Sequence, residues 1–164
     1  MAGDHQADGA PAAELDGNGL RIAVVSARWN SHVTLRLIDG VRRGLAEAGV
    51  DPADIIESWV PGAFELPLAA KAWAQSGRID AVVCLGCVIR GETTHYESVA
   101  GECASGIQQV QLETGVPIAF GALTVENLDQ ALARSEGPGG HNVGEDGARV
   151  VVEMATLLRS IRTP

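Results

Sequence analysis

The amino-acid sequence predicts a three-layer α/β sandwich built around a four-stranded parallel sheet. Apolar runs rich in β-branched residues, typical of buried strands, alternate along the chain with segments whose apolar residues recur at helical spacing. Of the 164 residues, 46% are hydrophobic but only 4% are aromatic, so the core must be aliphatic, as packed α/β layers allow. The alternation of strand and helix implies right-handed crossovers and helices on both faces of the sheet.

Each element follows from a local pattern, beginning with the apolar run LRIAVVSA, which predicts a strand at 20–27. The first helix is expected at 32–48, because apolar residues recur there at helical spacing and Gly49 is a typical helix end. The same alternation predicts the later elements, which are a strand at 54–60, a helix at 63–76, a strand at 79–88, a helix at 94–114, a strand at 116–124, a short helix at 127–135 and a helix at 145–161.

Two segments differ in composition from these elements. Residues 1–18 hold four acids, no Lys or Arg, and Leu15 as their one large apolar residue, so we expect a disordered acidic tail before a single domain at 19–164. Residues 135–147 contain five glycines and a proline and are expected to form a loop. This composition fits either a plain connector or a loop that moves with a ligand.

Charge and cysteine content exclude several classes of function. The chain has 12 basic and 21 acidic residues, a net charge of −9, so it lacks the basic surface that nucleic acids or anionic membranes require. It has no long apolar stretch and no signal peptide pattern, and its three cysteines do not form a disulfide framework. We therefore expect a cytoplasmic protein.

The residues that follow each expected strand are the first candidates for a site, because ligands of open parallel sheets bind beyond the carboxyl ends of the strands. These positions hold RWN at 28–30, PGAFE at 61–65, IRGETTH at 89–95 and LTVEN at 123–127. Two of these segments carry an aromatic residue, although the chain has few. A flat ligand rich in π electrons would suit them.

The segment GETTHYE at 91–97 is the richest of these. Gly91 allows close approach of a ligand to the backbone, and the next amides lie where a helix begins, which fits a phosphate site. A plain helix start capped by Thr explains the same residues equally well. His95, inside this helix start, is either a structural residue or a group that exchanges protons near neutral pH. No motif for nucleoside triphosphates or dinucleotides is present.

Cys84 and Cys87 match the C-x-x-C pattern of redox and metal sites, but their place within a strand argues against both. Residues three apart in a strand point to opposite faces of the sheet, so the two thiols cannot share a metal or form a disulfide. No other Cys or His cluster completes a zinc site. We expect both residues, and Cys103, to be buried structural cysteines, and we expect no metal site.

The ordered motifs VPGAFELP at 60–67, GCVIRGETTHYE at 86–97 and GVPIAFGALTVENLDQALAR at 115–134 resemble lumazine synthase, from about Leu20 to Arg162. The resemblance implies a flavodoxin-like fold and the penultimate step of riboflavin biosynthesis. That transferase reaction condenses 5-amino-6-ribitylaminouracil with 3,4-dihydroxy-2-butanone 4-phosphate to 6,7-dimethyl-8-ribityllumazine, and it releases phosphate and water. The implied reaction uses no cofactor. It also needs no enzyme lysine, which agrees with Lys71 being the single lysine.

The resemblance also assigns roles to individual residues. It implies that the pyrimidine ring and ribityl chain are held by Trp29, Asn30, Gly62, Ala63, Phe64, Glu65, Val88 and Ile89. It implies a phosphate site made by Gly91, Glu92, Thr93 and Arg134. His95 and Arg134 are the implied catalytic residues, with His95 as general acid and base. Phe120 matches a residue that reaches the site across a subunit boundary, so the resemblance implies at least a pentamer with shared sites.

One position departs from the family pattern. Val143 stands where a run such as G-N-K-G usually places a lysine, and the spacing from Arg134 is one residue longer. The departure weakens phosphate binding, or His141 partly replaces the lysine, or the chain is a paralogue that binds flavins or lumazines or forms a shell without efficient catalysis. Asp146 matches an acid that orients Arg134. A decamer, a sixty-subunit shell and riboflavin synthase as a partner are further implications left open.

Overall fold

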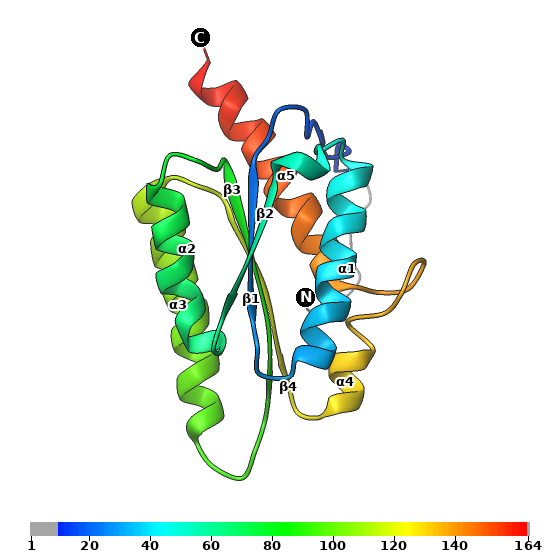
Figure 1. Cartoon of the computed structure of the whole chain (residues 1–164), viewed down its shortest axis with the longest axis vertical. Helices are drawn as coiled ribbons and strands as arrows, with labels where there is room; N and C mark the ends of the chain where they lie inside the picture. Colours follow the sequence, from blue (N-terminus) through cyan, green and yellow to red (C-terminus); the bar gives the residue numbers. More distant parts are fainter. Residues whose placement is uncertain (1–9, 164) are drawn as a thin grey trace.

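The structure is a computed structural model, which describes residues 10–163. Its centre is a four-stranded sheet in the order β2-β1-β3-β4, and every neighbouring pair of strands is parallel (Figure 1). The strands are β1 (Ile22–Ala27), β2 (Ile55–Val60), β3 (Ala81–Ile89) and β4 (Ile118–Val125). The structure confirms the predicted α/β, flavodoxin-like arrangement.

Helices cover both faces of this sheet. In Figure 1 the face on the right is covered by α1 (Ser31–Glu47), α4 (Leu128–Leu132) and α5 (Val143–Arg162). The face on the left is covered by α2 (Leu66–Gln75) and α3 (His95–Thr114). Two 3₁₀ turns, η1 (Pro52–Asp54) and η2 (Ala63–Glu65), precede β2 and α2.

Two hydrophobic clusters lie between the three layers, because successive residues of a strand face opposite sides of the sheet. In β1, Ile22 and Val24 belong to the cluster under α1 and α5, whereas Ala23 and Val25 belong to the cluster under α2 and α3. The same alternation separates the cysteines of β3. Cys84 lies in the α2/α3 cluster and Cys87 in the α1/α5 cluster, as their spacing predicts.

The structure shifts some expected boundaries by a few residues. The helix expected at 63–76 begins as the 3₁₀ turn η2 and becomes α2 only at Leu66. The last helix begins at Val143, two residues earlier than expected, because the Asn142 side chain accepts hydrogen bonds from the amides of the first turn. The short helix near 127–135 is a single turn, α4.

The segment before β1 is partly ordered against the domain. Residues 1–9 of the expected tail lie outside the described residues. Gly17 is buried, and its amide donates a hydrogen bond of 2.8 Å to the carbonyl of Ala48 at the end of α1. Among residues 10–163, no helix has the length and apolar character needed to cross a membrane.

Helices α1 and α5 pack closely against each other at glycine positions. A Cβ atom added to Gly44 of α1 would lie 2.8 Å from the Ala148 Cβ and 2.8 Å from the carbonyl oxygen of Glu145, both in α5. The Glu145 carbonyl belongs to the backbone of α5, so it cannot shift away from an added Cβ as the end of a flexible side chain could. The position therefore excludes any side chain unless the two helices separate.

We predict that Gly44→Ala lowers the free energy of unfolding. Overpacking costs about 1–3 kcal/mol, which exceeds the roughly 1 kcal/mol that alanine gains over glycine in a helix. Gly101→Ala in α3 is the matched control, because nothing lies within 4 Å of its added Cβ, and it should raise stability. Thermal unfolding at equal protein concentration measures both variants. A higher melting temperature for Gly44→Ala would contradict the close packing.

Candidate active site

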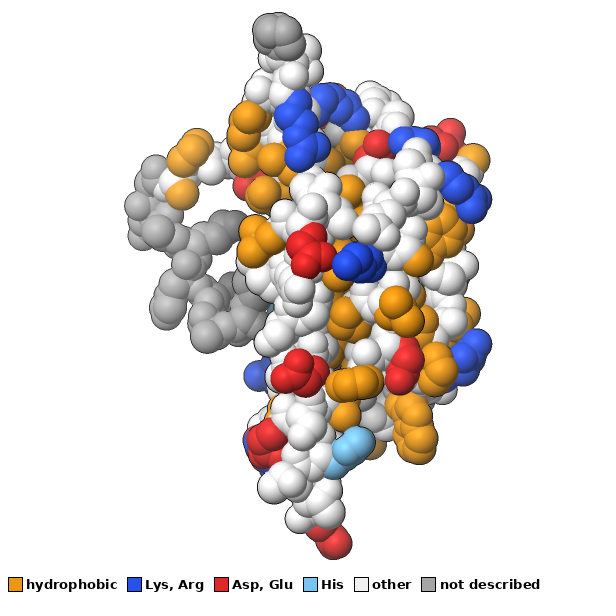
Figure 2. Space-filling model, turned by 90° about the vertical axis from the view of Figure 1, so that its left-hand side faces the viewer, with side chains coloured by type: hydrophobic (Ala, Val, Ile, Leu, Met, Phe, Trp, Pro, Cys, Tyr) orange, Lys and Arg blue, Asp and Glu red, His pale blue; other side chains and the backbone are white. Residues whose placement is uncertain are grey.

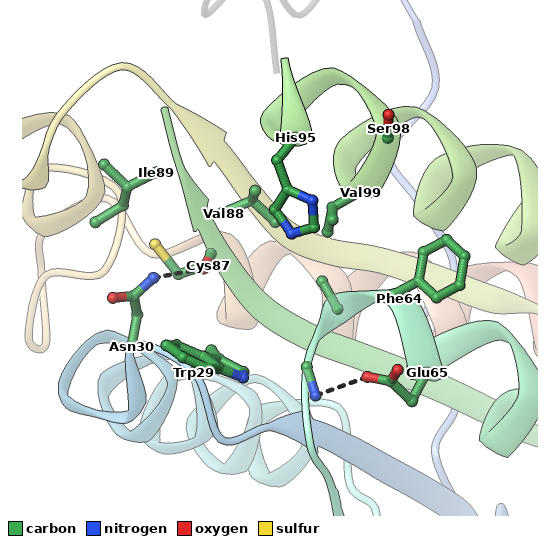
Figure 3. Close-up of a pocket in the computed structure, with 12 residues that line it drawn as sticks. Trp29, Asn30, Phe64, Glu65, Cys87, Val88, Ile89, His95, Ser98 and Val99 are labelled. Atoms are coloured by element: carbon green, nitrogen blue, oxygen red, sulfur yellow. Dashed lines mark hydrogen bonds between the residues drawn. The ribbon is translucent and has the colours of Figure 1, made fainter. Parts of the chain in front are cut away.

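A cavity of about 640 Å³ opens at the carboxyl edge of the sheet. Its walls come from the segment after β1, the turn after β2, the end of β3 and the first turn of α3 (Figure 3). It is lined by Trp29, Asn30, Gly62, Ala63, Phe64, Glu65, Cys87, Val88, Ile89, His95, Ser98 and Val99. The structure thus brings together residues from three of the four segments that sequence analysis singled out.

Hydrogen bonds join the strand ends beneath this cavity. The Trp29 amide donates to the Pro61 carbonyl at 3.3 Å, which extends the contact between β1 and β2 beyond the strands. The Asn30 side-chain nitrogen Nδ2 donates to the Cys87 carbonyl at 2.8 Å and ties the end of β1 to β3. Asn30 has φ 58° and ψ 40°, the left-handed conformation that asparagine tolerates better than most residues.

Two aromatic side chains stand exposed at the cavity. Trp29 is 74% exposed and Phe64 57% exposed, which leaves their ring faces available to a ligand. Gly62 makes room for Trp29, because an added Cβ there would lie 3.2 Å from the indole Cδ1. The Gly62 amide donates to Glu65 Oε2 at 2.9 Å, so this carboxylate closes the turn while its other oxygen remains available to a ligand.

His95 enters the cavity from the start of α3. Figure 3 shows its ring directed into the space above Trp29, beside Val88 and Val99. Ser98 and Val99, which sequence analysis did not name, line the same wall because they lie three and four residues after His95 on one helix face. Helical spacing would have revealed them. Thr94 is the N-cap residue but makes no side-chain cap bond, and Thr93 Oγ1 instead accepts from the His95 amide at 3.3 Å.

Arg90 braces the turn between β3 and α3. Its Nε lies 2.8 Å from Glu126 Oε2 after β4, and its Nη1 pairs with Glu97 of α3. Its guanidinium also lies 4.2 Å from the centroid of the Tyr96 ring. Hydrogen bonds to Glu97 and then Glu126 raise the pKa of Arg90. Arg90 thus stays charged and is paired with two carboxylates, which fixes the turn and leaves its guanidinium engaged rather than free to bind a ligand.

Several residues expected at the site lie outside the cavity lining of this chain, namely Gly91, Glu92, Thr93, Phe120 and Arg134. The first three are exposed in the turn that precedes α3. Phe120 is 42% exposed on the edge strand β4. Arg134 follows α4, where its Nη1 donates to the Gln130 carbonyl at 3.0 Å. A single chain therefore assembles the aromatic part of the expected site but not its cationic part.

The region of the departure at Val143 also differs from what the resemblance implies. The Val143 side chain packs against the α1/α5 cluster and points into the protein. His141 Nε2 lies 3.3 Å from Asp146 Oδ2, and Asp146 also approaches Arg149 at 3.8 Å. Among residues 10–163, the ion-pair partners of Asp146 are thus His141 and Arg149 rather than Arg134.

The cysteines are buried and unpaired. Burial raises the pKa of the Cys87 thiol to about 11 and that of Cys103 to about 12, and burial likewise raises the pKa of Cys84. Within residues 10–163, no three His, Cys, Asp or Glu side chains gather as a metal site would require. The Cys87 thiol therefore stays protonated and lines the cavity as an apolar group rather than as a nucleophile.

Most of the chain matches the model of a known protein family. The family model of 6,7-dimethyl-8-ribityllumazine synthase matches residues 19–159. This range contains all four strands and every residue that lines the cavity. The match confirms the resemblance that the three sequence motifs indicate.

We predict that Cys87 reacts slowly with a thiol reagent in the folded protein. A rise in pKa from 9.0 to about 11 lowers the thiolate fraction at pH 8 about a hundredfold. The rate should increase about tenfold per pH unit and level off only near pH 11. Disulfide-exchange kinetics with and without guanidinium chloride measure this. Rapid labelling of Cys87 at pH 8 in folded protein would contradict the assignment.

Proposed function

The chain belongs to the 6,7-dimethyl-8-ribityllumazine synthase family of riboflavin biosynthesis, and we propose that it catalyses that family's condensation. It would join 5-amino-6-ribitylaminouracil to 3,4-dihydroxy-2-butanone 4-phosphate and release 6,7-dimethyl-8-ribityllumazine, phosphate and water. The observation that carries the proposal is the cavity, where two exposed aromatic rings and an imidazole converge at the carboxyl edge of the sheet.

The pyrimidine substrate fits the aromatic part of this cavity. Its ring would stack on Trp29, whose 74% exposure leaves the indole face free, with Phe64 beside it. Val88 and Ile89 at the end of β3 are half-buried and line the same cavity beside this ring. The free oxygen of Glu65 would accept a hydroxyl hydrogen of the ribityl chain. Ring and chain are thus bound by different walls of one cavity.

The phosphate substrate would bind beside this ring, at the start of α3. The turn formed by Gly91, Glu92 and Thr93 precedes the helix, and helix N-termini favour anions through their free amides and dipole. Arg134 would supply the cation, as bidentate guanidinium contacts to phosphate are strong. Because Arg134 and Phe120 lie outside the lining of their own cavity, we propose that a neighbouring copy of the chain completes each site.

Exposed apolar side chains support self-association. Leu68 of α2 is 74% exposed and Leu112 of α3 is 73% exposed. Figure 2 shows hydrophobic side chains spread over the face that these helices cover. A second copy of the chain that packed on this face would cover these apolar side chains. We propose at least a pentamer, in the reducing cytoplasm that suits three buried, unpaired cysteines.

In the proposed reaction, His95 moves protons while the substrates supply the nucleophile and the leaving group. The amine of the pyrimidine attacks the ketone carbon, a C–N bond forms, and water leaves to give an imine. Elimination then removes a carbon-bound proton and breaks the C–O bond to phosphate, which departs with the electron pair and leaves an enol. His95 would accept and return protons in these steps, an effect typically worth about 10²- to 10⁴-fold. The enol becomes a ketone, the ribitylamino nitrogen attacks its carbonyl carbon, and loss of a second water closes the second ring.

A second candidate function follows from Val143. This position holds valine, whose half-buried side chain packs against the α1/α5 cluster, so the chain lacks the ammonium group that the family pattern usually provides here. His141, which is close in sequence, is engaged with Asp146 at 3.3 Å. A chain with weaker phosphate capture would bind flavins or lumazines, or form a shell, without efficient turnover. The Val143 position is the observation that favours this alternative.

Mixing the purified protein with both substrates distinguishes the two functions. The proposed enzyme converts them to product with lumazine absorbance and fluorescence at a rate well above the spontaneous reaction. If the rate equals that of the uncatalysed mixture while a lumazine still binds, the enzyme proposal fails and the binding alternative holds.

We predict that substitutions of the two catalytic candidates change different kinetic constants. Arg134→Ala should raise KM for the butanone phosphate at least about tenfold, because a charged hydrogen bond worth roughly 1.5–3 kcal/mol is lost. His95→Ala should lower kcat about 10²- to 10⁴-fold with little change in either KM. Steady-state kinetics with each substrate varied in turn measure both. Wild-type kinetics in both variants would overturn the assigned roles.

A further inference from the structure

The connection between α4 and α5 is a closed hairpin despite its glycine-rich sequence. Ser135 and Asn142 form an antiparallel bridge across it. The Val143 amide donates to the carbonyl of Arg134 at 2.9 Å, so the first residue of α5 holds the backbone of the residue that begins the hairpin. The position of Arg134 is therefore tied to the position of the α5 start.

The buried side chain of Asn142 controls this arrangement. It is 2% exposed and uses both ends of its amide group. Its Nδ2 donates to the carbonyls of Arg36 at 3.1 Å and Glu136 at 2.8 Å. Its Oδ1 accepts from the amides of Gly144 at 2.9 Å and Glu145 at 3.2 Å. One side chain thus connects α1, the hairpin and α5.

The surrounding backbone is shaped to admit this side chain. A Cβ atom at Gly40 of α1 would overlap Asn142 Oδ1 and its Cγ. A Cβ atom at Gly144 would overlap the carbonyl of Leu37. Asn142 therefore fits between α1 and α5 only because glycines stand at these two positions. All four of its hydrogen-bond partners are backbone groups. Such a fully satisfied buried polar group fixes one geometry, because any displacement leaves buried groups without partners.

We propose that Asn142 is a positioning residue for Arg134, and that its two donated hydrogen bonds set the affinity of the site for a phosphate group. This rests on the proposed function, in which Arg134 binds the substrate phosphate. The bond to Glu136 helps to close the hairpin, together with the bond from the Glu136 amide to the His141 carbonyl at 2.9 Å. The bond to Arg36 helps to fix the hairpin to α1, together with the bond from Arg36 Nε to the Ser135 carbonyl at 2.8 Å. Through the contact between Val143 and Arg134, both Asn142 bonds help to fix the backbone that carries the guanidinium.

Asn142→Ser separates this role from simple capping of α5. The serine Oγ can still accept from the first-turn amides, but it cannot reproduce both donated bonds. We expect KM for the butanone phosphate to rise about tenfold or more, a typical effect of losing a supporting hydrogen bond, while KM for the pyrimidine and kcat stay within about twofold. Asn142→Asp is the second variant: it keeps the acceptor and the shape but places a carboxyl oxygen against the two carbonyls, so KM for the butanone phosphate should rise at least as much.

Asn127→Ser is the matched control. Asn127 caps α4 by accepting from the Gln130 amide at 3.0 Å and so acts as an acceptor alone, which serine preserves. Its kinetics should equal those of the wild type. If Asn142→Ser instead lowers kcat and leaves both KM values unchanged, Asn142 is only structural and the proposal is overturned.

Binding of inorganic phosphate, measured by calorimetry, tests the proposal without turnover. Asn142→Ser and Arg134→Ala should both weaken it about tenfold or more, whereas Asn127→Ser should not. If the wild type forms no lumazine but this pattern is found, the proposed function fails and the positioning role stands. If the wild type forms lumazine and Asn142→Ser binds phosphate as the wild type does, the positioning role alone fails.

Discussion

The hydrogen bond from the Asn30 side chain to the Cys87 carbonyl is the interaction on which the rest of the site depends. A parallel sheet brings its carboxyl ends to one edge, but it does not by itself decide how the chain leaves each strand. The left-handed backbone of Asn30 turns the chain sharply into α1, and its side chain anchors that turn to β3. Trp29 is thereby presented to solvent over Gly62, where it forms one wall of the cavity.

The same edge is braced on its other side by charge. Arg90 joins the end of β3 to Glu126 after β4 and to Glu97 in α3, so one arginine fixes the turn that begins the helix. The chain has a net charge of −9, and many of its arginines form ion pairs with carboxylates. These are Arg21, Arg42, Arg43, Arg90 and Arg149. Arg134 forms no ion pair with any carboxylate of residues 10–163 and donates only to the Gln130 carbonyl there. An anion that meets this acidic protein must be captured by such a local group rather than by the overall field.

Much of the fold follows from the sequence because its signals are local. Continuous β-branched runs identify the strands, and helical spacing followed by glycine at Gly49 and Gly77 identifies two helix ends, where φ is +83° and +70°. The motifs after the strands also name most of the cavity lining, because the carboxyl ends of parallel strands share one edge.

What the sequence does not reveal depends on distant partners. The pairing of Arg90 with Glu126 joins two segments, the earlier start of α5 depends on a side chain buried against α1, and the inward side chain of Val143 depends on the core beneath it. These are tertiary contacts that no local pattern encodes.

In the proposed site, the cavity over Trp29 binds the pyrimidine, while the turn before α3 and Arg134 bind the phosphate. A crystal structure of the protein with 5-amino-6-ribitylaminouracil and inorganic phosphate tests this most directly. We expect the pyrimidine ring stacked on Trp29 beside His95, and a phosphate ion between residues 91–94 and the Arg134 guanidinium of a neighbouring copy. A pyrimidine bound away from Trp29, or a phosphate bound without Arg134, would contradict it.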